Sequence, residues 1–562
     1  MGDVLEFLID GTSGLAPGGV EGAAIVAGVC STGTVGQGYL LGKSSDLEGL
    51  LGVGPLVDRL RDVFAAGGQS PVVIAVPVTG QAAGYFTPVV QSGTGPAGAA
   101  SGSPASNADA VVEILTGGAL ETATYRVSED GGTTWGDETT TPANGQVAIG
   151  STGVTITLEA GTHVSGDTYS TTIRVPIGPV AHTGTGPDIA LAGTVAAAAE
   201  VQLQIVSGGT RNEGTYKLSV DGGDNWGAAK TIPADGDIVV GSTGVTITVP
   251  DSPDMVTGDV YAFDLMAPVP SMTDVMTALE TPLSLYDVEF VYVVGPSDSV
   301  DWAAMGTKAD ELWNAHRPTF FLAESRLPYD NEGVNGWTAA LVADKQGYSH
   351  RFVAVCSAFG EVTDTTGKRI VRSWAGLVAG RILATPVMRA IGRVRDGGIS
   401  QGALPSSFTE AMQQQLETAG FITAKYYAGL SSPYWGDGKT LADVTSDYQY
   451  LEVLRVVFKA VRKARIAALK SMYDEAGDVI LGADAAGLAY LQANIETALN
   501  TLKAAMPTEL ADYVVTIPDG QDIVNNGVAV EMELIGIPII RSIKLFAKYI
   551  YAGSTFDPRL EG

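Results

Sequence analysis

Residues 150–157 read GSTGVTIT, and the same eight residues return at 241–248, a spacing of 91. Other residues around the two copies keep this spacing, so the chain holds a tandem repeat. Within each copy Val, Ile and Thr alternate with period two, which is typical of a strand that buries one face. Gly, Asp, Asn and Pro clusters separate the short runs and indicate turns. We predict two all-β modules, each a small sandwich, over residues 91–178 and 179–268.

The segments on both sides of the repeat alternate between apolar strands and amphipathic helices. Before the repeat, AAIVAGVC at 23–30 and PVVIAVPV at 71–78 are typical of buried strands, and a helical pattern lies between them. After the repeat, VEFVYVV at 288–294 continues in the same style. This alternation favours an α/β domain. We predict one discontinuous α/β domain, residues 21–90 and 269–400, interrupted by the two modules.

Beyond residue 400 the pattern becomes helical and then β. Residues 448–472 and 484–505 form amphipathic helices, and residues 528–534 alternate as a strand. We predict a C-terminal α+β domain over 401–538 and a strand arm over 539–562. The fold class is therefore multidomain, mixed α/β and α+β: an interrupted α/β domain and a C-terminal α+β domain, with two tandem all-β sandwich-like insert modules.

The charge of the chain excludes several classes of partner. The 562 residues include 33 Lys and Arg against 62 Asp and Glu, a formal net charge of −29. The two modules alone hold five basic and twenty acidic residues. Nucleic acids and anionic membranes need clustered Lys and Arg, so we expect neither as a partner. No run of about 18 uncharged apolar residues occurs, and the acidic N-terminus is unlike a signal peptide, so we expect no membrane insertion and folding in a cytoplasm.

Residues suited to catalysis are scarce and scattered. The four histidines show no ligand spacing, the two cysteines are far apart, and the chain lacks HExxH, CxxC and GxSxG motifs. We therefore expect no catalytic, cofactor-binding or metal site, and a protein that is not an enzyme.

One motif occurs in both modules. SEDGGTTW at 128–135 and its copy SVDGGDNW at 219–226 resemble the Asp-box, a β-hairpin of sialidases and other glycan-acting propellers. The aspartate caps turn amides, the glycines adopt positive φ and the tryptophan packs on the hairpin, so we interpret the motif as a folding device. A surface adhesin or glycan-binding protein that uses these modules remains the alternative. The hairpin residues are Asp130, Trp135, Asp221 and Trp226.

The two ends of the chain look like strands on tethers. VLEFLI at 4–9 precedes a Gly-rich stretch at 11–19, and IIRSIKLFAKYIY at 539–551 lies near the other end. A short apolar strand on a tether cannot bury itself, and it is stabilised by adding to the sheet edge of another subunit. We expect the arms at 1–20 and 539–562 to join neighbouring copies through Val4, Leu5, Phe7, Ile9, Ile543, Leu545, Tyr549 and Tyr551.

The order of these features resembles the contractile tail sheath proteins of bacteriophages and related injection machines. The resemblance rests on AAIVAG at 23–28 with GKSSDL at 42–47, FAAGG at 64–68, SDYQYL at 446–451 and the closing strands of 519–551. The insert at 91–268 is a departure from the common core of that family, and it leaves the role of the modules open.

The resemblance implies a structural protein of the virion tail. Hexameric rings stack as a helical homo-oligomer around a tail tube protein, and terminal strands of neighbours join a sheet in the C-terminal domain of a third subunit. Baseplate and tail terminator proteins are the further partners. Contraction then drives the tube through the host envelope without a cofactor. A further hypothesis is that four basic residues of the helix at 448–472 face an acidic stripe on the tube: Arg455, Lys459, Arg462 and Lys463. The helix at 484–505 is the alternative tube contact.

Overall fold

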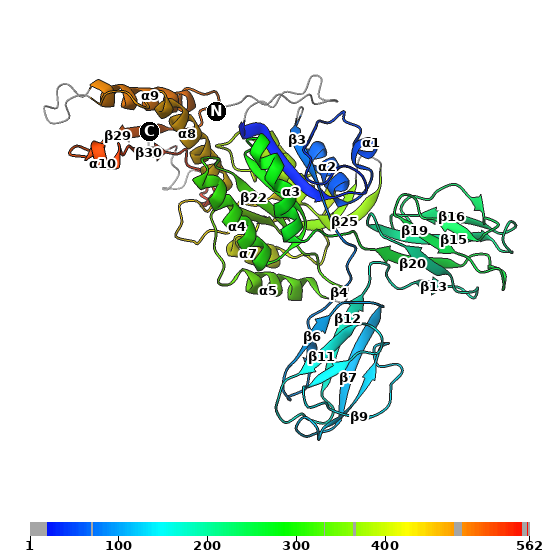
Figure 1. Ribbon diagram of the computed structural model, residues 1–562. Helices are drawn as coiled ribbons and strands as arrows, with labels where there is room; N and C mark the ends of the chain where they lie inside the picture. The colour runs from blue at the N-terminus through cyan, green and yellow to red at the C-terminus, as the bar shows by residue number, and fades with distance from the viewer. Residues whose placement is uncertain are drawn as a thin grey trace. The chain divides into compact units, whose positions relative to one another are not determined.

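The computed structural model describes residues 20–68, 71–330, 332–363, 367–476 and 486–552, together with residue 559. Figure 1 shows the helices and strands of these segments. The chain divides into a first unit, residues 1–387 and 391–462, and a second unit, residues 388–390 and 463–562. The N-terminal arm residues Val4, Leu5, Phe7 and Ile9 lie outside the described residues.

A six-stranded sheet organises the first unit, in the order β2-β3-β1-β21-β22-β23. β2 is antiparallel to β3, and the other neighbours pair in parallel. Because β1 pairs directly with β21, the strands before and after the modules form one sheet, as the alternating pattern predicts. The strands are β1 (Ala23–Val29), β2 (Tyr39–Leu41), β3 (Val72–Val78), β21 (Phe290–Ser297), β22 (Phe320–Ser325) and β23 (Val353–Cys356).

Local sequence explains why the helices of the first unit start where they do. Pro55 opens α2, where its fixed φ suits the first helical position and its missing N–H costs no hydrogen bond. Asp298 caps α4 in a reciprocal capping box with Asp301. The helices are α1 (Leu47–Leu51), α2 (Pro55–Ala66), α3 (Met272–Leu285), α4 (Ser299–Asn314), α5 (Val334–Lys345), α6 (Ala375–Ala384), α7 (Glu410–Ala419) and α8 (Leu451–Leu469), whose last residues belong to the second unit.

The core of the first unit extends beyond the predicted boundary at residue 400. Phe408, Leu416, Phe421 and Phe458 belong to the same buried cluster as the six-stranded sheet. The division of the chain therefore falls between residues 462 and 463, because apolar residues of the intervening segment pack into the α/β core. Two small sheets complete this part: β25 (Arg369–Ser373), β24 (Phe359–Thr363) and β26 (Gly402–Ala403) in that order, and β27 (Ala424–Tyr426) with β28 (Pro433–Trp435).

Module 1 is a sandwich of two sheets around its own core, shown in cyan tones in Figure 1. One sheet has the order β4-β12-β7-β8-β9, with β5 also paired to β12, and the other has the order β10-β11-β6. The module starts at β4, a few residues before the predicted boundary. Its strands are β4 (Tyr85–Phe86), β5 (Val90–Ser92), β6 (Gly98–Gly102), β7 (Ala108–Thr116), β8 (Thr124–Ser128), β9 (Thr139–Thr140), β10 (Gln146–Ala148), β11 (Val154–Leu158) and β12 (Thr168–Arg174).

Module 2 repeats this architecture around a separate core. Its sheets have the orders β13-β20-β15-β16-β17 and β14-β19-β18. The strands are β13 (Ala181–Thr183), β14 (Ala190–Gly193), β15 (Ala199–Ser207), β16 (Thr215–Ser219), β17 (Lys230–Thr231), β18 (Asp237–Val239), β19 (Val245–Thr248) and β20 (Val260–Leu265).

The second unit contains helices α9 (Ala486–Lys503) and α10 (Ile523–Asn526), and strands β29 (Asp512–Thr516) and β30 (Glu531–Ile535). β29 and β30 form a two-stranded antiparallel sheet. The strand predicted at 539–551 is not formed: the described residues after Ile535 have no strand assignment. A strand requires a partner, and this segment has no paired strand among the described residues.

Candidate functional site

Large apolar side chains lie exposed along residues 536–552, which we call the C-terminal segment. Monomeric proteins seldom expose a large contiguous apolar patch, so such a run marks a surface that another molecule covers. The side chains between 73% and 92% exposed are Ile540, Ile543, Leu545, Phe546, Tyr549 and Tyr551.

The spacing of these side chains suits a strand with one apolar face. In an extended backbone the side chains at i, i+2 and i+4 point to the same side. Ile543, Leu545, Tyr549 and Tyr551 share odd positions and form the more apolar side, whereas the even positions mix Ile540 and Phe546 with Lys544 and Lys548. The segment thus has the pattern of a half-buried strand but leaves its apolar face uncovered in the single chain.

The sheet in the same unit has room for further strands. β29 and β30 pair from Asp512 opposite Ile535 to Thr516 opposite Glu531. Each strand therefore has one edge whose N–H and C=O groups pair with no other strand of the described chain. Open edges of this kind are templates for an added strand, and two-stranded sheets are only marginally stable alone. The second unit thus presents both a strand-like segment and a sheet that can accept one.

The basic helix α8 buries two of its three arginines, Arg455 and Arg462, which corrects the prediction for both. Arg455 is 2% exposed and forms an ion pair with Glu289, with Nε 2.5 Å from Oε1. Arg455 also donates from Nη1 to the Thr385 carbonyl at 3.0 Å. Burial raises the pKa of Glu289, and the Arg455 charge opposes that shift. Arg455 therefore connects α8 to the residue that precedes β21, and its side chain is buried and not available to another protein.

Arg462 is also buried, at 8% exposure. Its Nη2 donates to the carbonyls of Val288, at 3.1 Å, and Pro318. Its Nε and Nη1 have no hydrogen-bond acceptor among the described residues, and burial lowers its pKa. Of the four basic residues predicted to face a tube, only Lys459 and Lys463 are half-buried and reach the surface.

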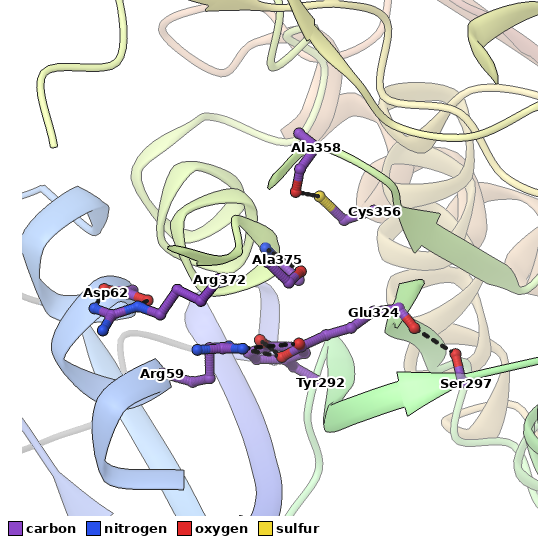
Figure 2. Close-up of polar contacts among 10 residues, drawn as sticks. Arg59, Asp62, Tyr292, Ser297, Glu324, Cys356, Ala358, Arg372 and Ala375 are labelled. Atoms are coloured by element: carbon purple, nitrogen blue, oxygen red, sulfur yellow. Dashed lines mark hydrogen bonds and ion pairs between the residues drawn. The ribbon is translucent and has the colours of Figure 1, made fainter. Parts of the chain in front are cut away.

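A second buried charge cluster lies in the α/β domain and was not predicted from the sequence (Figure 2). Arg59 of α2 donates twice to Glu324 of β22, at 2.8 and 3.0 Å, and Tyr292 of β21 donates to the same carboxylate at 2.5 Å. Arg372 pairs with Asp62 in the same way, at 3.0 and 2.5 Å. Glu324 and Asp62 are each 2% exposed.

This cluster connects elements and offers no reactive group to a substrate. Burial raises the pKa of Asp62, and the Arg372 charge opposes the shift. Because each carboxylate is matched by a guanidinium, the charges are neutralised where they lie. The sequence does contain a hint, since Asp62 interrupts the apolar face of the helix that starts at Pro55, and Glu324 follows the apolar run of the strand FFLAES.

A pocket of about 390 Å³ lies at the carboxyl end of β1, beside the point where the strand order reverses. This is where open α/β sheets commonly bind ligands. Its lining includes Cys30, whose Sγ donates to the Thr32 carbonyl and whose pKa burial raises to about 11. A thiol with a raised pKa is a poor nucleophile. The pocket therefore offers no catalytic chemistry that we can assign.

The two Asp-box aspartates cap their own turns. Asp130 accepts hydrogen bonds from the backbone N–H and the hydroxyl of Thr134, at 2.8 and 2.6 Å, and from Ser128 at 2.7 Å. These bonds lower the pKa of Asp130 to about 2, with the Thr134 hydroxyl as the largest cause. The Arg126 guanidinium lies 4.2 Å from the Trp135 ring centroid. In module 2, Asp221 makes matching bonds to Asn225 and Ser219, and Trp226 is 37% exposed.

The described residues contain no group of three or more His, Cys, Asp or Glu side chains placed to hold a metal ion. Their helices include none with the length and apolar character needed to cross a membrane.

Comparisons with known proteins agree with the predicted resemblance. A protein named "Putative tail sheath protein" from Haemophilus phage HP1 is 34% identical over 109 residues, which are 18% of this chain and 29% of the relative. The match thus spans less than a third of that relative's length. The resemblance to tail sheath proteins, predicted from the order of motifs, is confirmed by this relative's name.

Several solved structures are similar at low identity. The sheath tail protein of Desulfitobacterium hafniense is 11% identical, with 95% of this chain and 100% of that chain covered and a TM-score of 0.41. The sheath tail protein of Listeria innocua is 8% identical, with coverages of 92% and 96% and a TM-score of 0.40. The helical sheath of the anti-feeding prophage in its contracted state is 18% identical, with coverages of 52% and 78% and a TM-score of 0.36.

Family models give the broadest match. The model described as DUF2586, N-terminal domain, matches residues 1–439, and the model described as DUF2586, C-terminal domain, matches residues 447–554. Since the two matches together take in nearly the whole sequence, the chain belongs to the DUF2586 family.

Proposed function

We propose that this chain is the structural subunit of a contractile phage tail sheath, and that it polymerises by exchanging terminal strands between copies. The name of the curated relative supports the tail sheath role. The single observation that carries the exchange is the exposed apolar C-terminal segment in the same unit as the open-edged sheet of β29 and β30.

The energetics favour exchange between copies. Burying one large apolar side chain stabilises a protein by about 1.5–3 kcal/mol. Ordering the backbone opposes this by about 1–2 kcal/mol for each residue. A strand gains enough only when it also forms ladder hydrogen bonds and buries a whole face, which an added strand on a sheet edge provides. The sheet of a second copy offers such an edge, and each copy then links to the next.

The finer features of the proposal follow the sheath resemblance. Copies form hexameric rings that stack around a tail tube, with baseplate and tail terminator proteins at the ends, and the assembly belongs to the virion tail. The N-terminal arm, with Val4, Leu5, Phe7 and Ile9, supplies a second exchanged strand. Lys459 and Lys463 of α8 contact the tube. Contraction releases free energy stored at assembly, and the chain acts as a mechanical part and not as an enzyme.

Electron microscopy of the purified full-length chain tests the proposal. We expect hollow tubes of uniform diameter from the wild-type chain. A chain that ends at Ile535 should form no tubes, because it lacks one of the two strands that link each copy to its neighbours. Tubes from the truncated chain, or a monomeric wild-type chain at high concentration, would contradict the proposal.

A further inference from the structure

The two modules carry the same hairpin motif in different surroundings. Asp221 of module 2 is 3% exposed, whereas its counterpart in module 1, Asp130, is exposed. The aspartates are equivalent in space as well as in sequence. The backbone of Asp130 forms an isolated β-bridge with that of Asp109 in module 1, and the backbone of Asp221 forms one with that of Glu200 in module 2. We call the acidic surface around each pair the Asp-box face of that module. The difference in exposure therefore comes from what covers each face.

The Asp-box face of module 2 holds the free edge of a strand. β25 is an edge strand of its small sheet. The backbone N–H of Arg369 donates to Asp221, and the backbone N–H of Val371 donates to Glu200. These two N–H groups are two residues apart, so they point to the same side of the strand. The carboxylates thus accept the hydrogen bonds that the carbonyls of a neighbouring strand would accept.

Basic side chains at the start of β25 strengthen this contact. The Arg369 guanidinium lies 3.3 Å from a carboxylate oxygen of Asp224, and Lys368 donates to the Ala198 carbonyl at 2.8 Å. Asn225, next to the capping aspartate, donates to the Gly367 carbonyl at 3.1 Å. The face of module 2 therefore recognises an extended strand edge flanked by cations.

The equivalent face of module 1 keeps the two carboxylates at these positions, Asp109 and Asp130, without such an occupant among the described residues. The Asp109 side chain is 49% exposed, and one of its oxygens accepts from Arg174 at 3.0 Å. Asp130 is exposed beside it, and Thr133 and Thr134 take the places of Asp224 and Asn225 of module 2. The carboxylates of module 1 thus have the register that binds β25 in module 2, and they remain accessible.

We infer that the Asp-box face of module 1, formed by Asp109 and Asp130, docks a strand edge with a flanking lysine from a second copy of this chain. The equivalent face of module 2 is filled by β25 of this same chain. The negative charge of module 1 complements a basic strand edge. The inference rests on the proposed function, which makes copies neighbours. A contact between two different surfaces propagates from copy to copy and suits a helical assembly.

Cross-linking in mixed polymers tests the inference. Full-length chains, half of them labelled with ¹⁵N, are assembled together and treated with a carbodiimide, which joins carboxylates to lysine amines. We expect mixed-isotope links between a lysine peptide of one copy and the module 1 peptides that contain Asp109 or Asp130. Links from Lys368 to the module 2 face should form within one copy and serve as the positive control.

Each outcome is decisive. Polymers that give the Lys368 control link but no mixed-isotope link to module 1 overturn the inference and leave the proposed function intact. Failure to polymerise overturns both. As an independent measurement, the variant D109N should raise the critical concentration of assembly ~2–5-fold with the thermal midpoint of the monomer unchanged, as expected for losing one exposed ion pair. The matched control D137N, which removes an exposed acid elsewhere on module 1, should leave it unchanged.

Discussion

Shortening two side chains of the C-terminal segment should weaken assembly without affecting the fold of the monomer. Leu545 and Tyr549 are 89% and 81% exposed, so the double variant L545A/Y549A removes little packing from the single chain. In the proposed exchanged strand, both side chains lie on the buried face. Losing their burial removes about 1.5–3 kcal/mol for each residue, or roughly 3–6 kcal/mol together. At about 1.4 kcal/mol for each factor of ten, the critical concentration should rise about 100- to 10,000-fold.

Sedimentation of polymer over a concentration series measures this change. The control S542A/K544A alters the same segment on the opposite face, and it should shift the critical concentration by less than about threefold because exposed groups contribute little. Both variants should keep the thermal midpoint of the monomer. An L545A/Y549A chain that assembles like the wild type, with its monomer fold intact, would refute the proposal that this face is buried between copies.

Three further predictions concern the fold. Replacing Arg455 by Met should destabilise the first unit by about 3–5 kcal/mol in urea unfolding, because Glu289 is left as an unpaired buried charge; a double variant that also replaces Glu289 by Leu should recover most of the loss. The pKa of Asp130 is lowered from 3.8 to about 2 by its hydrogen bonds, with the Thr134 hydroxyl as the largest cause. Its contribution to hairpin stability is therefore present above pH 3.8 and lost as the pH falls through about 2, and D130N should remove this dependence in amide exchange of the hairpin. Replacing Gly28 by Ala should cost about 1–3 kcal/mol, because the added Cβ would meet the Val294 Cβ at 2.8 Å; an unchanged thermal midpoint would show that β1 and β21 pack less closely than described.

Local sequence patterns were enough to predict the helices and strands whose positions depend only on their own residues. The helix at 55–66 and the strands at 23–29 and 72–78 form where the apolar spacing predicts them. Each copy of the repeat also has a hydrophobic core of its own. These features need no information about distant parts of the chain.

Predictions failed where the deciding partner is distant in sequence. Arg455 and Arg462 belong to the basic side of an amphipathic helix, which favours an exposed position. Their hydrogen-bond acceptors, Glu289 for Arg455 and the Pro318 carbonyl for Arg462, lie more than 140 residues away in the sequence. The boundary at 400 was wrong for the same reason, since residues such as Phe458 pack into the sheet core. The motif also predicts the same environment for both Asp-box hairpins, whereas β25 covers the one in module 2.

High-resolution imaging of the assembled tubes tests the central claim most directly. The account predicts that residues 539–551 of one copy lie as an added strand against β29 or β30 of another copy, with Leu545 and Tyr549 buried. A map in which the same residues fold back onto their own unit, with each sheet edge of β29 and β30 left bare, would contradict it.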